Sequence, residues 1–535
     1  MRTPKQGTLL GTLALAALLP AAMLQTATPA AAESVVTVMR TIDTDRYDPH
    51  KSTARSTAEA LFMVGDTLVA LDPDLKTVHP LLAKSWTVSE DGKLYTFKLR
   101  DDVTFCSGKK FTAKDVKGSI DRWLDPETKG VVKNRAGDVK EVRAVDDYTV
   151  EYELTQPYSE LLFQMTQHFH TIINIDQVKE LGADFGVKGF DGTGPYCFES
   201  WEPRNELVLK KHEAYKWGPA FYDNKGPAKV DRLVWKIVPE DNNRVAGIQS
   251  NQGDATQYIP YWAVDQLEAN PQIAVTKAPN YFWTYFVGFK ITREIADDLT
   301  IRKALNLAVD QKAIAEGPFF GKAEPAYSYI HPNVLDYNKQ GVDQSIFGFD
   351  PEAAKKLLDD AGWKVGSDGF RYKDGKKLHL LAYSFTNIWQ QIMEAMQGDM
   401  RKVGAELEIQ VFDATVIWGK LATQDFDMFT MSYPYVSAGD AMNLYFPSAN
   451  RPTPNRVNWA DDETDKWLLE GRGALTAEDR FAAYAKIQKK VHDAAIWIPI
   501  VHEPMFVAAG PRLKPIPAHG IYGAGLYKGL GIELK

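Results

Sequence analysis

The histidines, serines and acidic residues of this sequence do not form a recognised catalytic motif. The sequence has no G-x-S-x-G elbow for a nucleophilic serine, no H-E-x-x-H pattern for zinc and no glycine-rich phosphate loop. His212-Glu213 and His502-Glu503 each lack the second histidine of a zinc site. Acidic residues are numerous, so composition leaves paired-acid hydrolysis open, although nothing marks a pair. We therefore expect no enzyme, and a secreted hydrolase acting on peptides or glycans is the weaker alternative.

One short segment, His168-Phe169-His170, is a candidate for metal binding. Alternate residues of a β-strand share a face, so a strand here would point both imidazoles the same way, as a metal site requires. The other interpretation is two polar residues on a half-exposed strand, and we favour it. We predict neither a metal nor a cofactor.

The chain has two cysteines, Cys106 and Cys197. Two cysteines exclude a cysteine-built zinc ribbon or iron–sulfur site and allow one intrachain disulfide at most. We predict that they are bonded, and the alternative is a pair of buried free thiols. Closing so long a loop would contribute up to about 4–5 kcal/mol to stability in the chain-entropy model.

Aromatic residues gather in two places. One run is Tyr281-Phe282-Trp283-Thr284-Tyr285-Phe286; the other contains Trp418, Phe429 and Tyr433-Pro434-Tyr435. Each of these residues, taken singly, is explained equally well as part of the hydrophobic core or as a ligand contact. As groups they favour a ligand cleft, because Tyr and Trp combine a wide apolar face with a polar tip.

The first 32 residues have the features of an export signal. Arg2 and Lys5 precede an apolar stretch from Leu9 to Leu24, and the segment ends in an Ala-x-Ala site at Ala30–Ala32. Pro20 interrupts the apolar stretch, which is also short for a membrane span. We expect cleavage after Ala32, a mature protein in the periplasm and, without a cysteine at the cleavage site, no lipid anchor.

Composition and charge are those of a globular protein of several domains. The 535 residues are 44% hydrophobic and 25% charged, with a formal net charge of −8. That charge argues against a broad phosphate-binding face, so we expect no nucleic-acid partner. No apolar run after the signal is long enough to span a membrane, so contact with the membrane is expected only through a partner.

Local patterns predict mixed α and β structure. Asp91-Gly92 and Asp146-Asp147 sit between alternating segments and predict two hairpins. Thr112 with Asp115 predicts the start of a helix. Further on, helices are expected over 300–309, from 350 to 362, over 388–403 and from 476, with a strand over 407–411. The alternation of helices and strands predicts βαβ units and a substantially parallel sheet in this half.

Four sequence blocks stand out after the signal segment. They are Leu61-Phe62 through Pro80-Leu81-Leu82-Ala83 to Phe111-Thr112-Ala113-Lys114-Asp115-Val116; Gly192-Thr193-Gly194-Pro195-Tyr196; Ile301-Arg302-Lys303-Ala304-Leu305-Asn306; and Asp350-Pro351-Glu352-Ala353-Ala354 to Ala361-Gly362-Trp363. In this order they resemble family 5 of the extracellular solute-binding proteins, the dipeptide, oligopeptide and nickel class that serves ABC importers. Each block alone is weak evidence, whereas all four together are specific.

The resemblance implies an α/β, two-lobed periplasmic-binding-protein-like fold (type II, cluster C). The first lobe would comprise residues 33–280 and 501–535, with an extra inserted subdomain over about 56–190, and the second lobe residues 281–500. A small molecule or peptide would be enclosed between the lobes by hinge closure. The protein, expected as a monomer, would then dock on the permease subunits of an ABC transporter.

The sequence departs from the peptide binders of this family where they hold the ligand's charges. An acid is expected near Tyr433 to Tyr435, and only Asp440 matches the later acid; an Arg is expected near Phe385 and Asn387. A buried ligand charge without a partner is costly. The ligand is therefore left open among a peptide, a carbohydrate, an opine-like conjugate, a cationic compound bound by cation–π contacts and a metal or haem chelate. The expected ligand-binding residues are Tyr281, Trp283, Tyr285, Phe385, Asn387, Trp418, Tyr433, Tyr435 and Asp440.

Overall fold

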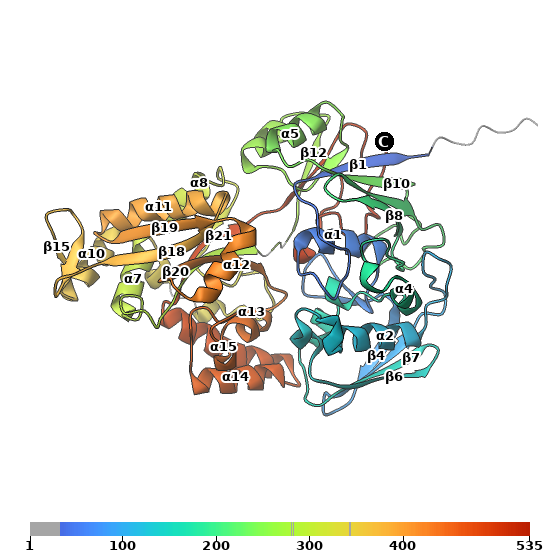
Figure 1. Cartoon of the computed structure of the whole chain (residues 1–535), viewed down its shortest axis with the longest axis horizontal. Coiled ribbons are helices and arrows are strands. Elements are labelled where there is room, and N and C mark those ends of the chain that lie inside the picture. The colour runs from blue at the N-terminus through green and yellow to red at the C-terminus, as the bar shows by residue number, and fades with distance from the viewer. Residues whose placement is uncertain (1–32, 280, 282, 342–343) are drawn as a thin grey trace, which may run out of the picture.

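The computed structural model describes residues 33–279, 281, 283–341 and 344–535, without the side chains of 344–345, 414–415 and 433–434. The predicted signal peptide lies outside the described residues. Figure 1 shows two lobes side by side, one coloured mostly blue to green and the other yellow to red. Each lobe is organised around a large β-sheet.

The first lobe contains a seven-stranded sheet in which β1 (Val35–Arg40) pairs in parallel with two strands, while the other neighbours are antiparallel. Alternation of buried and exposed residues along its strands places one face on the core. The strand order is β12 (Ala274–Lys277), β22 (Phe506–Ala509), β11 (Ala255–Thr256), β1, β10 (Arg232–Ile237), β9 (Glu206–Lys211), β8 (Tyr196–Glu202).

The second lobe contains a six-stranded sheet, and the prediction that it is substantially parallel was wrong. Two strand pairs are parallel, β18 with β19 and β18 with β20, and the other three are antiparallel. The local βα pattern predicts the direction of β18 and β19 only. β13 and β21 lie next to crossings between the lobes, and those crossings set their direction. The order is β14 (Glu324–Pro325), β21 (Trp497–Glu503), β13 (Trp283–Phe289), β20 (Met428–Pro434), β18 (His379–Phe385), β19 (Glu406–Phe412).

The predicted helices of this lobe are confirmed, and their ends follow local chemistry. Asp350 accepts a hydrogen bond from the Ala353 amide at the start of α10, and Thr476 caps α15 in the same way. Apolar faces of the first three helices share one core with the sheet, whereas α15 packs in the other core cluster. The four helices are α7 (Leu299–Ala308), α10 (Pro351–Asp360), α11 (Ile388–Lys402) and α15 (Ala477–Asp493).

The two predicted hairpins are confirmed, and they join in one antiparallel sheet of order β4 (Ala83–Val88), β5 (Leu94–Leu99), β7 (Thr149–Leu154), β6 (Val139–Asp146). Helix α2 (Ala113–Leu124) begins with the predicted pairing of Thr112 and Asp115. This sheet lies in the range predicted as an inserted subdomain, whose limits remain a prediction.

The chain passes between the two large sheets twice. It leaves β12 for β13 after Lys277, and it leaves β21 for β22 after Glu503. The two crossings lie side by side, because the Ala278 amide donates to the Met505 carbonyl at 2.8 Å. Paired crossings of this kind can act as a hinge. Strand β21 of the second sheet continues to Glu503, past the predicted limit at residue 500, so we assign Glu503 to the second lobe by its sheet. The exact lobe limits at residues 280 and 500 remain predictions.

Candidate ligand-binding cleft between the lobes

A carboxylate at the second crossing organises the first aromatic run. Glu503, the last residue of β21, accepts hydrogen bonds from the hydroxyls of Tyr261 at 2.5 Å, Tyr285 at 3.3 Å and Tyr281 at 3.5 Å. Burial raises the pKa of Glu503, while nearby Arg55 and the three hydroxyls act in the opposite direction. The side chain is a half-buried acid held in place by phenol hydroxyls.

The cation of this site comes from the other lobe. Arg55 begins helix α1 (Arg55–Val64), and its guanidinium lies 5.0 Å from the ring centre of Tyr258 and 5.4 Å from that of Trp283. Its ion pair with Glu59, one helical turn on, is loose at 3.8 Å. Burial opposes its charge, yet the surrounding phenols and carboxylates raise the pKa of Arg55 well above its ordinary value. The guanidinium therefore stays charged.

Two adjoining cavities open beside these groups. The smaller, of about 210 Å³, is lined by Arg55, Tyr258, Tyr281 and Glu503 among others. The larger, of about 670 Å³, shares Tyr261 with it and is lined by residues of both lobes. From the first lobe come Glu240, Asp241 and Trp262, and from the second Pro318, Phe320, Asn387, Ile388 and Gln391. The larger volume is within the usual range of small-ligand pockets.

The structure brings together only part of the predicted set. Tyr281, Trp283 and Tyr285 surround Glu503 and Arg55, and Asn387 lines the larger cavity. Helix α11 starts at that point without a side-chain cap, and Ile388 and Gln391 of its first turn also line the larger cavity.

The rest of the set lies elsewhere. Tyr435 is 1% exposed and packs edge-on against Tyr445, with ring centres 6.2 Å apart. Phe385 contacts Trp418, which is half exposed. The described residues that line the two cavities do not include any of these three. The side chain of Tyr433 lies outside the described residues. A ligand contact from these four remains a prediction.

Asp440 links the two lobes. Its carboxylate pairs with Arg135 at 2.9 Å and accepts from the Gln164 amide at 3.3 Å, and both partners belong to the first lobe. All three side chains are buried. The negative charge predicted to meet a ligand is therefore compensated by a cation of the protein.

The expectation of a strand over His168–His170 was wrong: these residues form a short 3₁₀ helix. Both rings are buried, and each Nε2 faces a backbone carbonyl, of Ser52 at 3.3 Å and of Arg135 at 3.4 Å. Burial lowers the pKa of both histidines to about 3, so they are neutral. Each buried imidazole thus has a backbone carbonyl as its partner. This pairing favours a turn that buries both rings over a strand with one face open to solvent.

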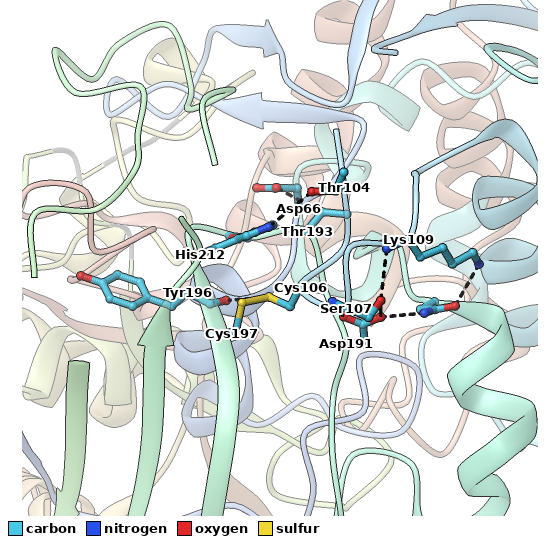
Figure 2. The surroundings of a disulfide bond; sticks show 12 residues. Asp66, Thr104, Cys106, Ser107, Lys109, Asp191, Thr193, Tyr196, Cys197 and His212 are labelled. Carbon is cyan, nitrogen blue, oxygen red and sulfur yellow. Dashed lines mark hydrogen bonds between the residues drawn. A yellow bond between two sulfur atoms is a disulfide. The ribbon is translucent and has the colours of Figure 1, made fainter. Parts of the chain in front are cut away.

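The predicted disulfide is confirmed: Cys106 and Cys197 are bonded, with Cα atoms 5.7 Å apart (Figure 2). The surroundings are tied by hydrogen bonds, as the Cys106 amide donates to the Gly192 carbonyl and Ser107 donates to Asp191. His212 lies close to both sulfurs, but its Nδ1 donates to the Gly194 carbonyl, and sulfurs bonded to each other do not offer thiolates. The disulfide thus fastens the 104–109 loop to strand β8.

Four residues central to the cleft were missed by sequence reasoning: Arg55, Tyr258, Tyr261 and Glu503. Glu503 was considered only as the neighbour of His502 in an incomplete zinc pattern. No sequence pattern near Arg55 predicts that it lies beside Glu503, because the crossings between the lobes bring the two residues together. The aromatic run at 281–286 was the one usable signal.

Comparison with known proteins identifies the family. The family model "Bacterial extracellular solute-binding proteins, family 5 Middle" matches residues 77–453. The chain belongs to this family. A family 5 solute-binding protein serves an ABC importer, and the two-lobed α/β fold predicted from the sequence is confirmed.

The relatives of this family 5 protein cover nearly its whole length. The glutathione-binding protein GsiB of Escherichia coli O1:K1 / APEC is 27% identical over 495 residues, 90% of this chain and 91% of the relative. Among solved structures, NikA from Brucella suis in complex with Fe(III)-EDTA has a TM-score of 0.83 at 24% identity, covering 94% and 100% of the two chains. DppA from Helicobacter pylori in complex with the peptide STSA has a TM-score of 0.79 at 22% identity, covering 94% and 98%. Among the described residues, no helix combines the length and apolarity needed to span a bilayer.

Proposed function

We propose that this protein captures a small zwitterionic peptide, or a peptide-sized solute with both charges, by closing its lobes around it, and delivers it to a membrane permease. The single observation that carries the proposal is that Arg55 and Glu503 line the same cavity. One belongs to helix α1 of the first lobe and the other to strand β21 of the second. A half-buried cation and a half-buried acid at one cavity together match the two ends of such a ligand.

With Arg55 on one lobe and Glu503 on the other, a ligand that pairs with both binds the closed form more tightly. An ammonium group would pair with Glu503 and the tyrosine hydroxyls, and a carboxylate would pair with Arg55. The uncapped start of α11 offers a second position for negative charge. A ligand that contacts both lobes binds the closed form better than the open one, and only that difference shifts the equilibrium.

Arg55 and Glu503 supply the charged partners that a zwitterionic ligand lacks at the positions expected for this family. No Arg stands at 383–387, directly before α11, and no acid stands at 433–435, so a zwitterion would lack partners there. Arg55 and Glu503 supply both charges from other elements. The glutathione-binding relatives and the peptide-bound structural neighbour support the same ligand class.

The remaining parts of the proposal concern export and assembly. We propose cleavage after Ala32, a periplasmic location, a monomer, and binding without turnover. Delivery to a permease whose separate ATPase subunits supply energy agrees with the missing phosphate loop in the sequence.

Isothermal titration calorimetry of the exported protein tests the ligand class. The probes are reduced glutathione and the tetrapeptide Ser-Thr-Ser-Ala, each also with a blocked amino terminus or an amidated carboxyl terminus. We expect the free-termini forms to bind at least tenfold more tightly than the blocked forms. Mass spectrometry of the recovered probes should show them unchanged.

Two variants and one control assign the charges. Glu503→Gln should remove the preference for a free amino group, and Arg55→Ala the preference for a free carboxylate. Lys179→Ala removes an exposed cation on helix α4 (Ile175–Leu181) and should leave both preferences intact. Failure of every peptide, together with binding of an oligosaccharide, an opine, a quaternary ammonium compound or a metal or haem chelate, would contradict the proposal; cleaved probes would favour a hydrolase.

A further inference from the structure

Far from the hinge, the two lobes also meet through a buried carboxylate. Glu160 of the first lobe is 0% exposed and contacts two hydroxyls of the second. The Ser437 hydroxyl is hydrogen-bonded to Oε1, and the Tyr484 hydroxyl donates to Oε2 at 3.1 Å. The neighbouring Ser159 donates from its amide to the Arg472 carbonyl at 2.8 Å, which holds the segment in place. We call Glu160, Ser437 and Tyr484 the latch.

The backbone of the second lobe comes unusually close to this carboxylate. Ser437 caps helix α13 (Ala438–Tyr445), and Gly439 lies in its first turn. A Cβ atom added at Gly439 would lie 2.5 Å from Oε2 of Glu160 and 2.3 Å from Cε2 of Tyr484. Only a residue without a side chain permits this contact between the lobes.

The charged groups around the latch are already paired with one another. On α13, Asp440 pairs with Arg135 of the first lobe at 2.9 Å. On α15, Arg480 pairs with Asp336 at 2.6 Å. The ion pairs among the described residues include no partner for Glu160. The remaining titratable neighbours are phenols, Tyr484 itself and Tyr158, over which the guanidinium of Arg472 lies at 4.6 Å.

We propose that Glu160 makes closure of the lobes proton-dependent, so that the closed form takes up a proton at this carboxylate and acidification favours closure. The physical reason is that opening returns Glu160 to water, where it is ionised, whereas closing buries it against hydroxyls without a cation. A protonated carboxyl can donate to the Ser437 oxygen and still accept from Tyr484.

The sign follows from linkage. Burial raises the pKa of Glu160 to about 7, the hydrogen bond with Ser437 opposes the rise, and the charge of Asp440 adds to it. In the open form we expect the ordinary value of about 4.3. The closed form therefore binds more protons than the open form between these values. The ratio of closed to open molecules should rise about tenfold from pH 8 to pH 6.

Distance measurement on the ligand-free exported protein tests the latch directly. The two native cysteines are bonded to each other, so cysteines introduced by Lys114→Cys and Lys466→Cys can carry spin labels. Both positions are exposed, on α2 of the first lobe and on α14 (Asp462–Arg472) of the second. Double electron–electron resonance then gives the closed and open populations at pH 6, 7 and 8.

Three variants complete the test. Glu160→Gln keeps the size and the hydrogen bonds without the charge, and it should abolish the pH dependence. Gly439→Ala changes no titratable group and should lower the closed population at every pH. Glu180→Gln, an exposed acid on α4, is the matched control and should behave like the wild type.

The inference rests on the proposed closing motion, and the two can fail separately. Two populations whose ratio does not change with pH would overturn the latch alone, as would a pH dependence that persists in Glu160→Gln. One population at every pH, unchanged by any of the peptide probes, would overturn the closing motion as well. If Glu160→Gln does not fold, a wild-type ratio that does not change with pH still overturns the latch.

Discussion

Two aromatic runs that look alike in the sequence occupy different environments. In the run at 281–286, Tyr281 and Tyr285 donate to Glu503, and Trp283 faces the guanidinium of Arg55. In the run at 433–435, Tyr435 is almost fully buried beside Tyr445. The first run lies at a crossing between the lobes, and the second at the end of β20 within one lobe.

The comparison teaches that aromatic clustering alone does not distinguish a cleft from a core. What distinguishes the first run is a cavity lined by Glu503 and Arg55, two half-buried charged groups that are not paired with each other among the described ion pairs. Burying such groups is costly unless something pairs with them, so their presence marks a place where a ligand can. Beside the second run, Asp440 and Arg135 are buried and pair directly at 2.9 Å. The second run resembles ordinary core packing.

The largest expected effect is a difference in stability between truncations in the two aromatic runs. Tyr435→Ala should lower the free energy of unfolding by about 3–5 kcal/mol, as large aromatic truncations in a core do. Trp283→Ala, at a half-buried position, should cost clearly less. Urea unfolding of the ligand-free proteins measures both. Unchanged stability of Tyr435→Ala with weakened glutathione binding would return Tyr435 to the ligand site.

The next effect concerns a histidine behind the first run. The Thr284 hydroxyl is hydrogen-bonded to Nδ1 of His502 at 3.0 Å. Burial lowers the pKa of His502 well below its ordinary value, so the unfolded chain takes up the proton first as the pH falls. This residue should therefore cost about 2 kcal/mol of stability between pH 7 and pH 5. His502→Gln should reduce the acid sensitivity by that amount in urea titrations, and His379→Gln, at the surface, should not.

A smaller effect tests the contact between Trp283 and Arg55. Trp283→Phe keeps an aromatic ring but weakens the cation–π attraction, which is worth about 0.5–1 kcal/mol at such sites. Glutathione affinity measured by calorimetry should fall two- to fivefold through misplacement of Arg55. An affinity equal to that of the wild type would show that Trp283 does not position the guanidinium.

The smallest effect is expected at Trp418. This residue is half exposed and contacts Phe385 and the guanidinium of Arg456, 5.4 Å from the ring centre. Trp418→Ala should change stability by less than about 1 kcal/mol and leave peptide affinity unchanged. A large loss of affinity would place Trp418 and Phe385 in the ligand site, as the sequence predicts.

Features that depend on neighbouring residues could be predicted from the sequence. Asp91-Gly92 specified a hairpin because glycine takes the left-handed conformation found there, at φ +69°. Thr112 and Asp115 specified the start of α2, and the two cysteines could bond only to each other. The four sequence blocks that resemble family 5 predicted the two-lobed fold.

The tertiary structure alone decided the directions of β13 and β21, the helical turn at His168–His170 and the partnership of Arg55 with Glu503. Each depends on residues far apart in the sequence. The crossings between lobes bring Arg55 and Glu503 together, whereas His168 and His170 meet the carbonyls of Ser52 and Arg135 within the first lobe. Local patterns record how a segment meets its own neighbours, whereas the pairing of distant charges is settled by packing, desolvation and the path of the chain.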